Sequence, residues 1–141
     1  MKKLLPILAF VFLYSCSSTK NTASKPLYEV LTVNNDGGAN IKFYEILTEP
    51  KEIMMLLSDE TLKKKIKSSD TTNSSFIILN AGPTKETYNR IKIEKVVETA
   101  TEVEIYIKDT QKNTAIDLSD ENTLFPYTIV KVNSKKPIII K

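Results

Sequence analysis

Glu102 and Glu104 are the acidic residues whose spacing comes closest to a catalytic arrangement. Two residues that are two positions apart on a strand share a face, which would set their carboxylates roughly 6 to 7 Å apart. A glycosidase can use such a pair. However, lysines interrupt the same predicted strand face, and the sequence has no Trp and few other aromatic residues to hold a sugar. We therefore keep a carboxylate-dependent hydrolase only as a minor alternative and expect no catalytic residues.

The composition removes several other chemistries. The chain of 141 residues contains no His, which excludes Ser-His-Asp triads and imidazole-bound metals. Its three Gly cannot build the glycine-rich loops that hold nucleotide phosphates. We expect neither a cofactor nor a metal, because the folded part offers no His or Cys ligand.

The first 16 residues have the pattern of a targeting segment. Lys2 and Lys3 precede an apolar run over residues 4–13, which is too short to span a ~30 Å hydrocarbon core. A charged start, a short apolar stretch and small residues at its end are typical of a secretory signal peptide. We therefore predict a signal peptide over residues 1–15.

Cys16 is the only cysteine and stands directly after this segment. The sequence Leu13-Tyr14-Ser15-Cys16 resembles the bacterial lipobox, although Tyr14 is bulkier than the residue usual at its position. The resemblance implies cleavage before Cys16, a diacylglyceryl group on its thiol and an acyl chain on its amine. Several acyl chains would anchor the protein firmly to a membrane.

Residues 16–26 are polar, lack apolar periodicity and end in Pro, so we predict a flexible tether. No acidic run follows Cys16, which favours an outer-membrane anchor that faces the periplasm. Without Lys2 and Lys3 the excess of basic over acidic residues falls from three to one, so we expect no nucleic-acid binding. Residues 27–141 are predicted to form a single domain.

The pattern of apolar residues predicts an α+β fold, mainly antiparallel β, as a small sheet or sandwich with one helical segment near residues 50–67. Pro50 suits the first helical position, and the lysines at 63–67 are expected on a solvated helix face. A turn signal at residues 34–38 separates the first two strands. The strands are expected at residues 27–33, 41–47, 76–79, 91–97, 103–107, 127–133 and 137–140.

Three features of these strands can be tested directly. The continuous apolar run at residues 76–79 predicts a strand that is buried on both faces. If residues 91–97 and 103–107 form a hairpin, their odd-numbered apolar positions should pair, which requires an odd number of residues in the connection. Residues 127–133 and 137–140 are expected to pair with each other across a turn that contains two lysines.

Short motifs in the second half of the chain resemble those of a known family. They are Phe76-Ile77-Ile78-Leu79-Asn80-Ala81-Gly82, Tyr88 and Phe125-Pro126-Tyr127-Thr128-Ile129-Val130. On these residues, the second half resembles the protease complex subunit PrcB family and its C-terminal domain. The similarity covers residues 75–140, and members often carry Thr-Gly-Gly-Tyr where residues 84–88 stand here. It implies an exported lipoprotein that assists a surface or periplasmic protease without catalysing a reaction itself.

The loops around Gly82 and Pro126 are the candidate partner-binding region. Gly82 and Pro126 each stand at a strand end, where a loop can be rigid and exposed. The functional interpretation is that the two loops meet and face a partner; the alternative is that they serve only the fold. The loops could instead enter a cleft, as in an inhibitor or ligand-binding domain. Thr84, Lys85 and Glu86 are expected to be exposed and to have no packing role. The candidate residues are Gly82, Thr84, Lys85, Glu86, Tyr88, Pro126 and Tyr127.

Overall fold

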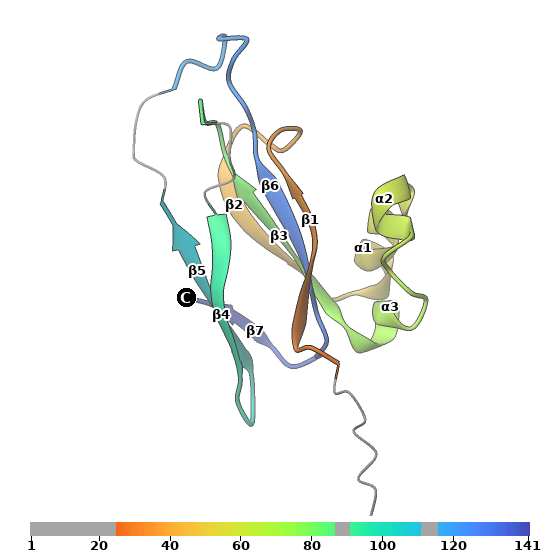
Figure 1. Cartoon of the computed structure of the whole chain (residues 1–141). Helices are drawn as coiled ribbons and strands as arrows, with labels where there is room; N and C mark the ends of the chain where they lie inside the picture. Colours follow the sequence, from red (N-terminus) through yellow and green to blue (C-terminus); the bar gives the residue numbers. More distant parts are fainter. Residues whose placement is uncertain (1–24, 87–90, 111–115) are drawn as a thin grey trace, which may run out of the picture.

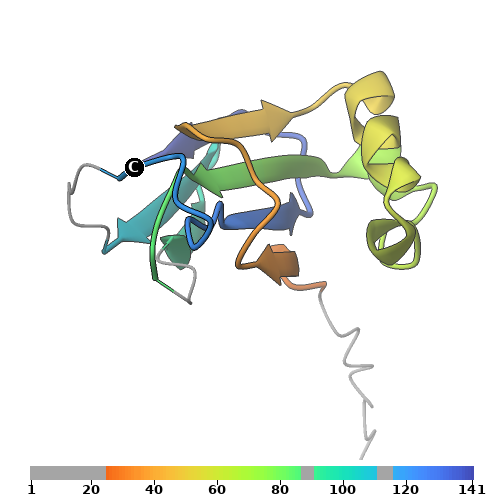
Figure 2. The same ribbon diagram turned by 90° about the horizontal axis from the view of Figure 1, so that it is seen from above.

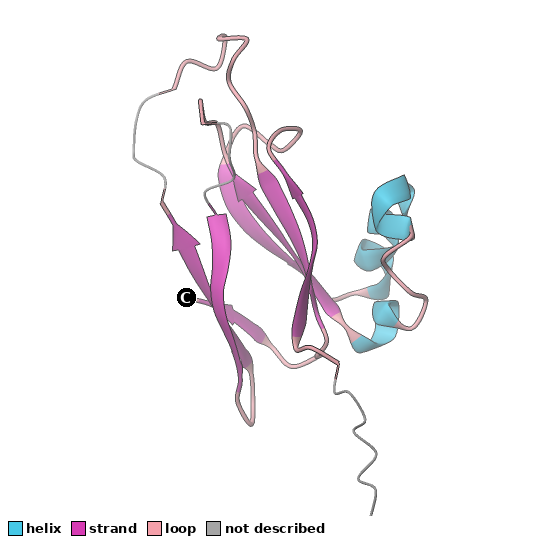
Figure 3. Cartoon of the chain, viewed as in Figure 1, coloured by secondary structure: helices cyan, strands magenta, loops and turns pink. Residues whose placement is uncertain are grey.

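The computed structural model describes residues 25–86, 91–110 and 116–141. Its strands form two sheets, and short helices cover the outer face of the larger one (Figures 1 and 3). The predicted class, α+β with mainly antiparallel strands, is confirmed. The larger sheet has the order β1-β6-β3-β2, with strands Tyr28–Asn34, Tyr127–Val132, Ser75–Ala81 and Lys42–Leu47. The smaller sheet has the order β4-β5-β7, with strands Ile91–Glu98, Val103–Asp109 and Ile138–Ile140.

The larger sheet is the middle layer of three, with the smaller sheet on one side and the helices on the other (Figure 1). Figure 2 shows its strands side by side, in the order β2, β3, β6 and β1. On one side its apolar residues pack against the smaller sheet, and on the other they pack against the helices. β3 contributes to both cores, with Ile77 and Leu79 on the first side and Phe76 on the second, all of them buried. The prediction of a strand covered on both faces is therefore confirmed.

The predicted helical segment is divided into short pieces. They are α1 (Pro50–Met55), the 3₁₀ turn η1 (Leu56–Ser58) and α2 (Glu60–Lys63), and a further helix α3 (Asp70–Asn73) was not expected. The break lies at Asp59, whose side chain accepts the backbone N–H groups of Thr61 and Leu62 at 2.7 and 3.0 Å and so starts a new helix. The lysines at 63–67 are exposed, as expected.

The two strands that flank the turn signal do not pair with each other. β1 and β2 lie at opposite edges of the larger sheet, because β6 and β3 stand between them. The expected pairing of the last two strands is also wrong. β6 already has β1 on one side and β3 on the other, so β7 instead joins the second sheet, parallel to β5.

The connection between β4 and β5 contains four residues, not an odd number. Thr99 sets this turn by exchanging hydrogen bonds with Glu102. A bulge at Glu94 shifts the pairing register by one residue, so that Ile93 still lies opposite Ile107. On the other side of the bulge, Val96 and not Val97 packs into the core between the sheets. The parity argument failed because it assumed an uninterrupted ladder.

Candidate functional site

Three loops meet at one end of the sandwich, which we call the loop end: residues 34–41, 82–86 and 116–126. The described chain starts at the opposite end, beside the turn from β6 to β7 (Figure 1). There Asn133 binds the carbonyl groups of Pro26 and Leu27. The loop end is therefore the part of the sandwich farthest along its strands from the start of the described chain.

Backbone hydrogen bonds join two of these loops. Thr84 and Leu124 form an isolated antiparallel bridge, with both N–H to O distances at 2.8 Å. Next to it, the N–H of Ala81 donates to the carbonyl of Pro126 at 2.9 Å. The expectation that the loops after β3 and before β6 come together is thus met in the geometry.

The third loop is fixed by the buried side chain of Asn80. Its amide donates to the carbonyl groups of Ala39, at 2.9 Å, and Ile41, and it accepts the N–H of Ala39 at 2.9 Å. Gly38 donates to Phe125 at 2.7 Å, and a Cβ at Gly38 would come within 2.7 Å of that same carbonyl oxygen. Only glycine lets these two loops approach so closely.

The structure corrects one expectation about the candidate residues. Thr84, expected to be exposed, is only 4% exposed, because the bridge to Leu124 draws it inward and its hydroxyl accepts the N–H of Glu86. Lys85 is exposed and Glu86 is half-buried. Cys16 and Tyr88 lie outside the described residues.

The remaining candidate residues have clear structural roles. Gly82 has a φ of +73°, and a Cβ there would come within 3.0 Å of the backbone nitrogen of Lys42. Pro126 is buried, and Tyr127 packs partly against the helix-side core. The hydroxyl of Tyr127 accepts the side-chain amide of Asn34 at 2.5 Å. These residues position the loop end, while Lys85 is presented at its surface.

Lys85 forms an ion pair with Asp120, a residue that the sequence argument did not select. The ammonium group, together with the N–H and side-chain amide of Asn122, lowers the pKa of Asp120 from 3.8 to about 2. The pair adds a side-chain link to the backbone bridge between the two loops. The only sequence signal for Asp120 was the acidic stretch at residues 117–121, and such stretches are common on solvent-exposed surfaces.

The carboxyl group of Asp120 should titrate near pH 2, and in Lys85→Ala it should titrate closer to 3.8. Because the folded pKa is depressed, the ion pair is complete above pH 4 and is lost as the pH falls from 3.8 through about 2. Side-chain carbon NMR of the wild type and the variant measures both midpoints. Identical midpoints would show that Lys85 does not hold this carboxylate in solution.

The possible catalytic pair is engaged in other contacts. Glu102 belongs to the turn before β5, and the Glu104 carboxylate accepts the Tyr106 hydroxyl at 2.8 Å and lies 3.2 Å from the Lys141 ammonium. These groups lower the pKa of Glu104. A glycosidase general acid needs the opposite shift, so this environment does not favour an acid role.

Comparisons with family models, with curated proteins and with solved structures found no match to this chain. Within residues 25–86, 91–110 and 116–141, no helix is long and apolar enough to cross a membrane. Over the same residues, no group of three or more acidic side chains is placed to hold a metal ion. The loop end is therefore judged on its geometry alone.

Proposed function

We propose that this chain is a lipid-anchored, non-catalytic protein of the bacterial cell envelope that binds a protein partner through its loop end. A protease is the partner class implied by the resemblance to the PrcB family. The anchor is Cys16, in an outer membrane facing the periplasm. The partner would contact the exposed part of the loop end around Lys85, Glu86 and Asp120.

One observation carries this proposal: hydrogen bonds join the three loops of the loop end, which lies opposite the start of the described chain. A molecule tethered through residues 16–26 could hold this end away from the membrane. Loops that backbone bonds already fix lose little conformational entropy on binding, which favours affinity.

The second candidate is an inhibitor whose loop end enters a protease cleft. The backbone bridge between Thr84 and Leu124 favours it, because an inhibitor loop must keep its shape in the complex. Both candidates use the same surface. They differ in whether the captured protease is still active.

The test is a crosslinked pull-down of the full-length lipidated protein from its native envelope, followed by reconstitution with the identified partner. Lys85→Glu should lower the yield of the crosslinked partner about tenfold, because it reverses an exposed charge and places a carboxylate beside Asp120 in the proposed interface. Lys63→Glu is the matched control. Lys63 is also exposed and ion-paired, but it lies on α2, away from the loop end.

Equal capture by the wild type and Lys85→Glu would remove the loop end as the binding site. If no protein is enriched over the control, the interaction role itself is wrong. A 1:1 complex in which the protease loses its activity would select the inhibitor interpretation.

A further inference from the structure

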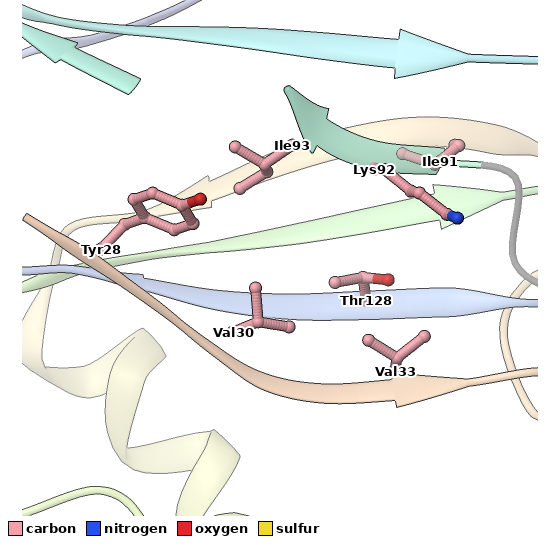
Figure 4. A pocket seen from close by; sticks show the side chains of 7 residues that line it. All are labelled: Tyr28, Val30, Val33, Ile91, Lys92, Ile93 and Thr128. Carbon is pink, nitrogen blue, oxygen red and sulfur yellow. The ribbon is translucent and has the colours of Figure 1, made fainter. Parts of the chain in front are cut away.

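The sandwich is open along one side, between the edge strands β1 and β4. A hollow of about 230 Å³ lies there, between the two sheets. Figure 4 shows side chains from both sheets converging on it. We call it the edge groove; its lining residues are Tyr28, Val30, Val33, Ile91, Lys92, Ile93 and Thr128.

Two valines of β1 are unusually exposed for residues on an inter-sheet face. Val30 and Val33 are 45% and 54% exposed, although both border the space between the sheets. A bulge between Val30 and Thr32 sends Leu31 to the helix side and leaves both valines facing the groove. Among the described residues, the second sheet borders this hollow with Ile91, Lys92 and Ile93, and about half of each valine stays exposed.

The backbone of β1 offers a second feature. β1 is an edge strand, and among the described strands it pairs only with β6. An edge strand can accept a further strand through its backbone N–H and C=O groups. At the bulge, the Lys65 ammonium binds the carbonyl of Leu31 and occupies that one position. On either side of the bulge, the outer edge of β1 has no described strand beside it.

The charge of the groove is positive. Lys92 is the one charged residue among the seven that line it, and its ammonium group lies at the groove (Figure 4). Its cross-strand neighbour in β5 is Lys108, another exposed lysine. Like charges directly opposite each other in a sheet are unfavourable, and an anion placed beside them would relieve the repulsion.

We propose that the edge groove binds an extended, acidic segment of a protein partner. The segment adds to the outer edge of β1 as a strand. Its alternate apolar side chains fill the space between Val30 and Val33 on one side and Ile91 and Ile93 on the other. Its carboxylate pairs with Lys92. The assignment to a protein partner rests on the proposed function, whereas binding to the groove is measured separately.

The probe is a fluorescein-labelled peptide of alternating Val and Thr that ends in Asp, titrated against the full-length protein in lipid nanodiscs. Fluorescence anisotropy should show saturable binding. Val33→Asp should weaken it at least tenfold, about 1.4 kcal/mol, by placing a charge in the apolar groove. Met54→Asp is the matched control, since Met54 is 59% exposed but lies on α1.

Lys92→Glu provides a second variant that leaves the valines untouched. It should weaken the binding of the peptide that ends in Asp and strengthen the binding of an otherwise identical peptide that ends in Lys. An equal loss of affinity for both peptides would contradict a role for the Lys92 charge.

Three outcomes would overturn the proposal. The first is the absence of saturable binding at millimolar peptide. The second is equal binding of a peptide whose alternate amides are N-methylated, because it cannot add as a strand. The third is displacement of the peptide by decanoate at lower concentrations than the peptide itself, which would assign the groove to an acyl chain. None of these outcomes depends on Lys85, so they leave the loop-end proposal unaffected.

Discussion

Replacing Asp70 with alanine is expected to lower the free energy of unfolding by about 3 kcal/mol. The reason is Lys131, a lysine on the central strand β6 that is almost completely buried. Its ammonium group lies 2.8 Å from the Glu29 carboxylate and 3.5 Å from the Asp70 carboxylate. Burial alone would lower the pKa of Lys131, but these two carboxylates outweigh it and raise the pKa. Without Asp70, the buried charge keeps only the partly exposed Glu29.

Asp70 also accepts the N–H of Lys67 at 2.9 Å and so holds the turn that leads into α3. Urea unfolding at pH 7 measures how much free energy of unfolding the Asp70→Ala variant loses. Adding Lys131→Met to Asp70→Ala should recover more than half of it, because the buried cation is then gone. Glu60→Ala, which removes an exposed ion pair with Lys63, should cost less than about 0.5 kcal/mol. If Asp70→Ala and Glu60→Ala cost the same, the buried triad contributes little.

Cys16→Ala is expected to release the protein from the membrane completely. Lipidation at Cys16 would supply about 0.8 kcal/mol per buried methylene group, and the variant lacks the thiol that receives the lipid. Partitioning between detergent and aqueous phases should therefore move the variant to the aqueous phase. Its thermal unfolding should not change, because the predicted anchor and the described core share no residues.

Ser18→Ala is the control for this experiment, since Ser18 lies two residues after Cys16 and outside the lipobox-like sequence. It should partition with the wild type, and metabolic labelling with a radioactive fatty acid should mark both proteins but not Cys16→Ala. Equal detergent partitioning of Cys16→Ala and the wild type would refute the lipoprotein proposal.

Local patterns predicted the strands well, because each depends on the residues of its own segment. The apolar run at residues 76–79 identified β3, and the alternation around Ile91 and Ile105 identified β4 and β5. α3 was missed because Asp70–Asn73 is made of polar residues that favour turns and caps. Its one buried residue, Asp70, forms an ion pair with Lys131, which lies on a strand distant in the sequence.

Strand pairing was predicted less well because it depends on which edges are free. Neighbours along the chain usually pair, but β6 has no free edge for β7. The loop end was found because Gly82 and Pro126 mark strand ends. Asp120 was missed because an acidic stretch does not show which carboxylate pairs with Lys85. The edge groove was missed because the bulge in β1 has no local sequence signature.

The pairing of β1 with β6 also bears on how the protein folds. Asn34 at the end of β1 and Tyr127 at the start of β6 are bonded, yet they are 93 residues apart in the chain. Such a contact gives the fold a high contact order, and the entropy of closing so long a loop must be lost before the pairing returns any free energy. β1 is therefore synthesised before every other described strand but cannot find its partner until β6 has emerged. During that interval its valines are exposed to solvent, which leaves this first strand open to aggregation.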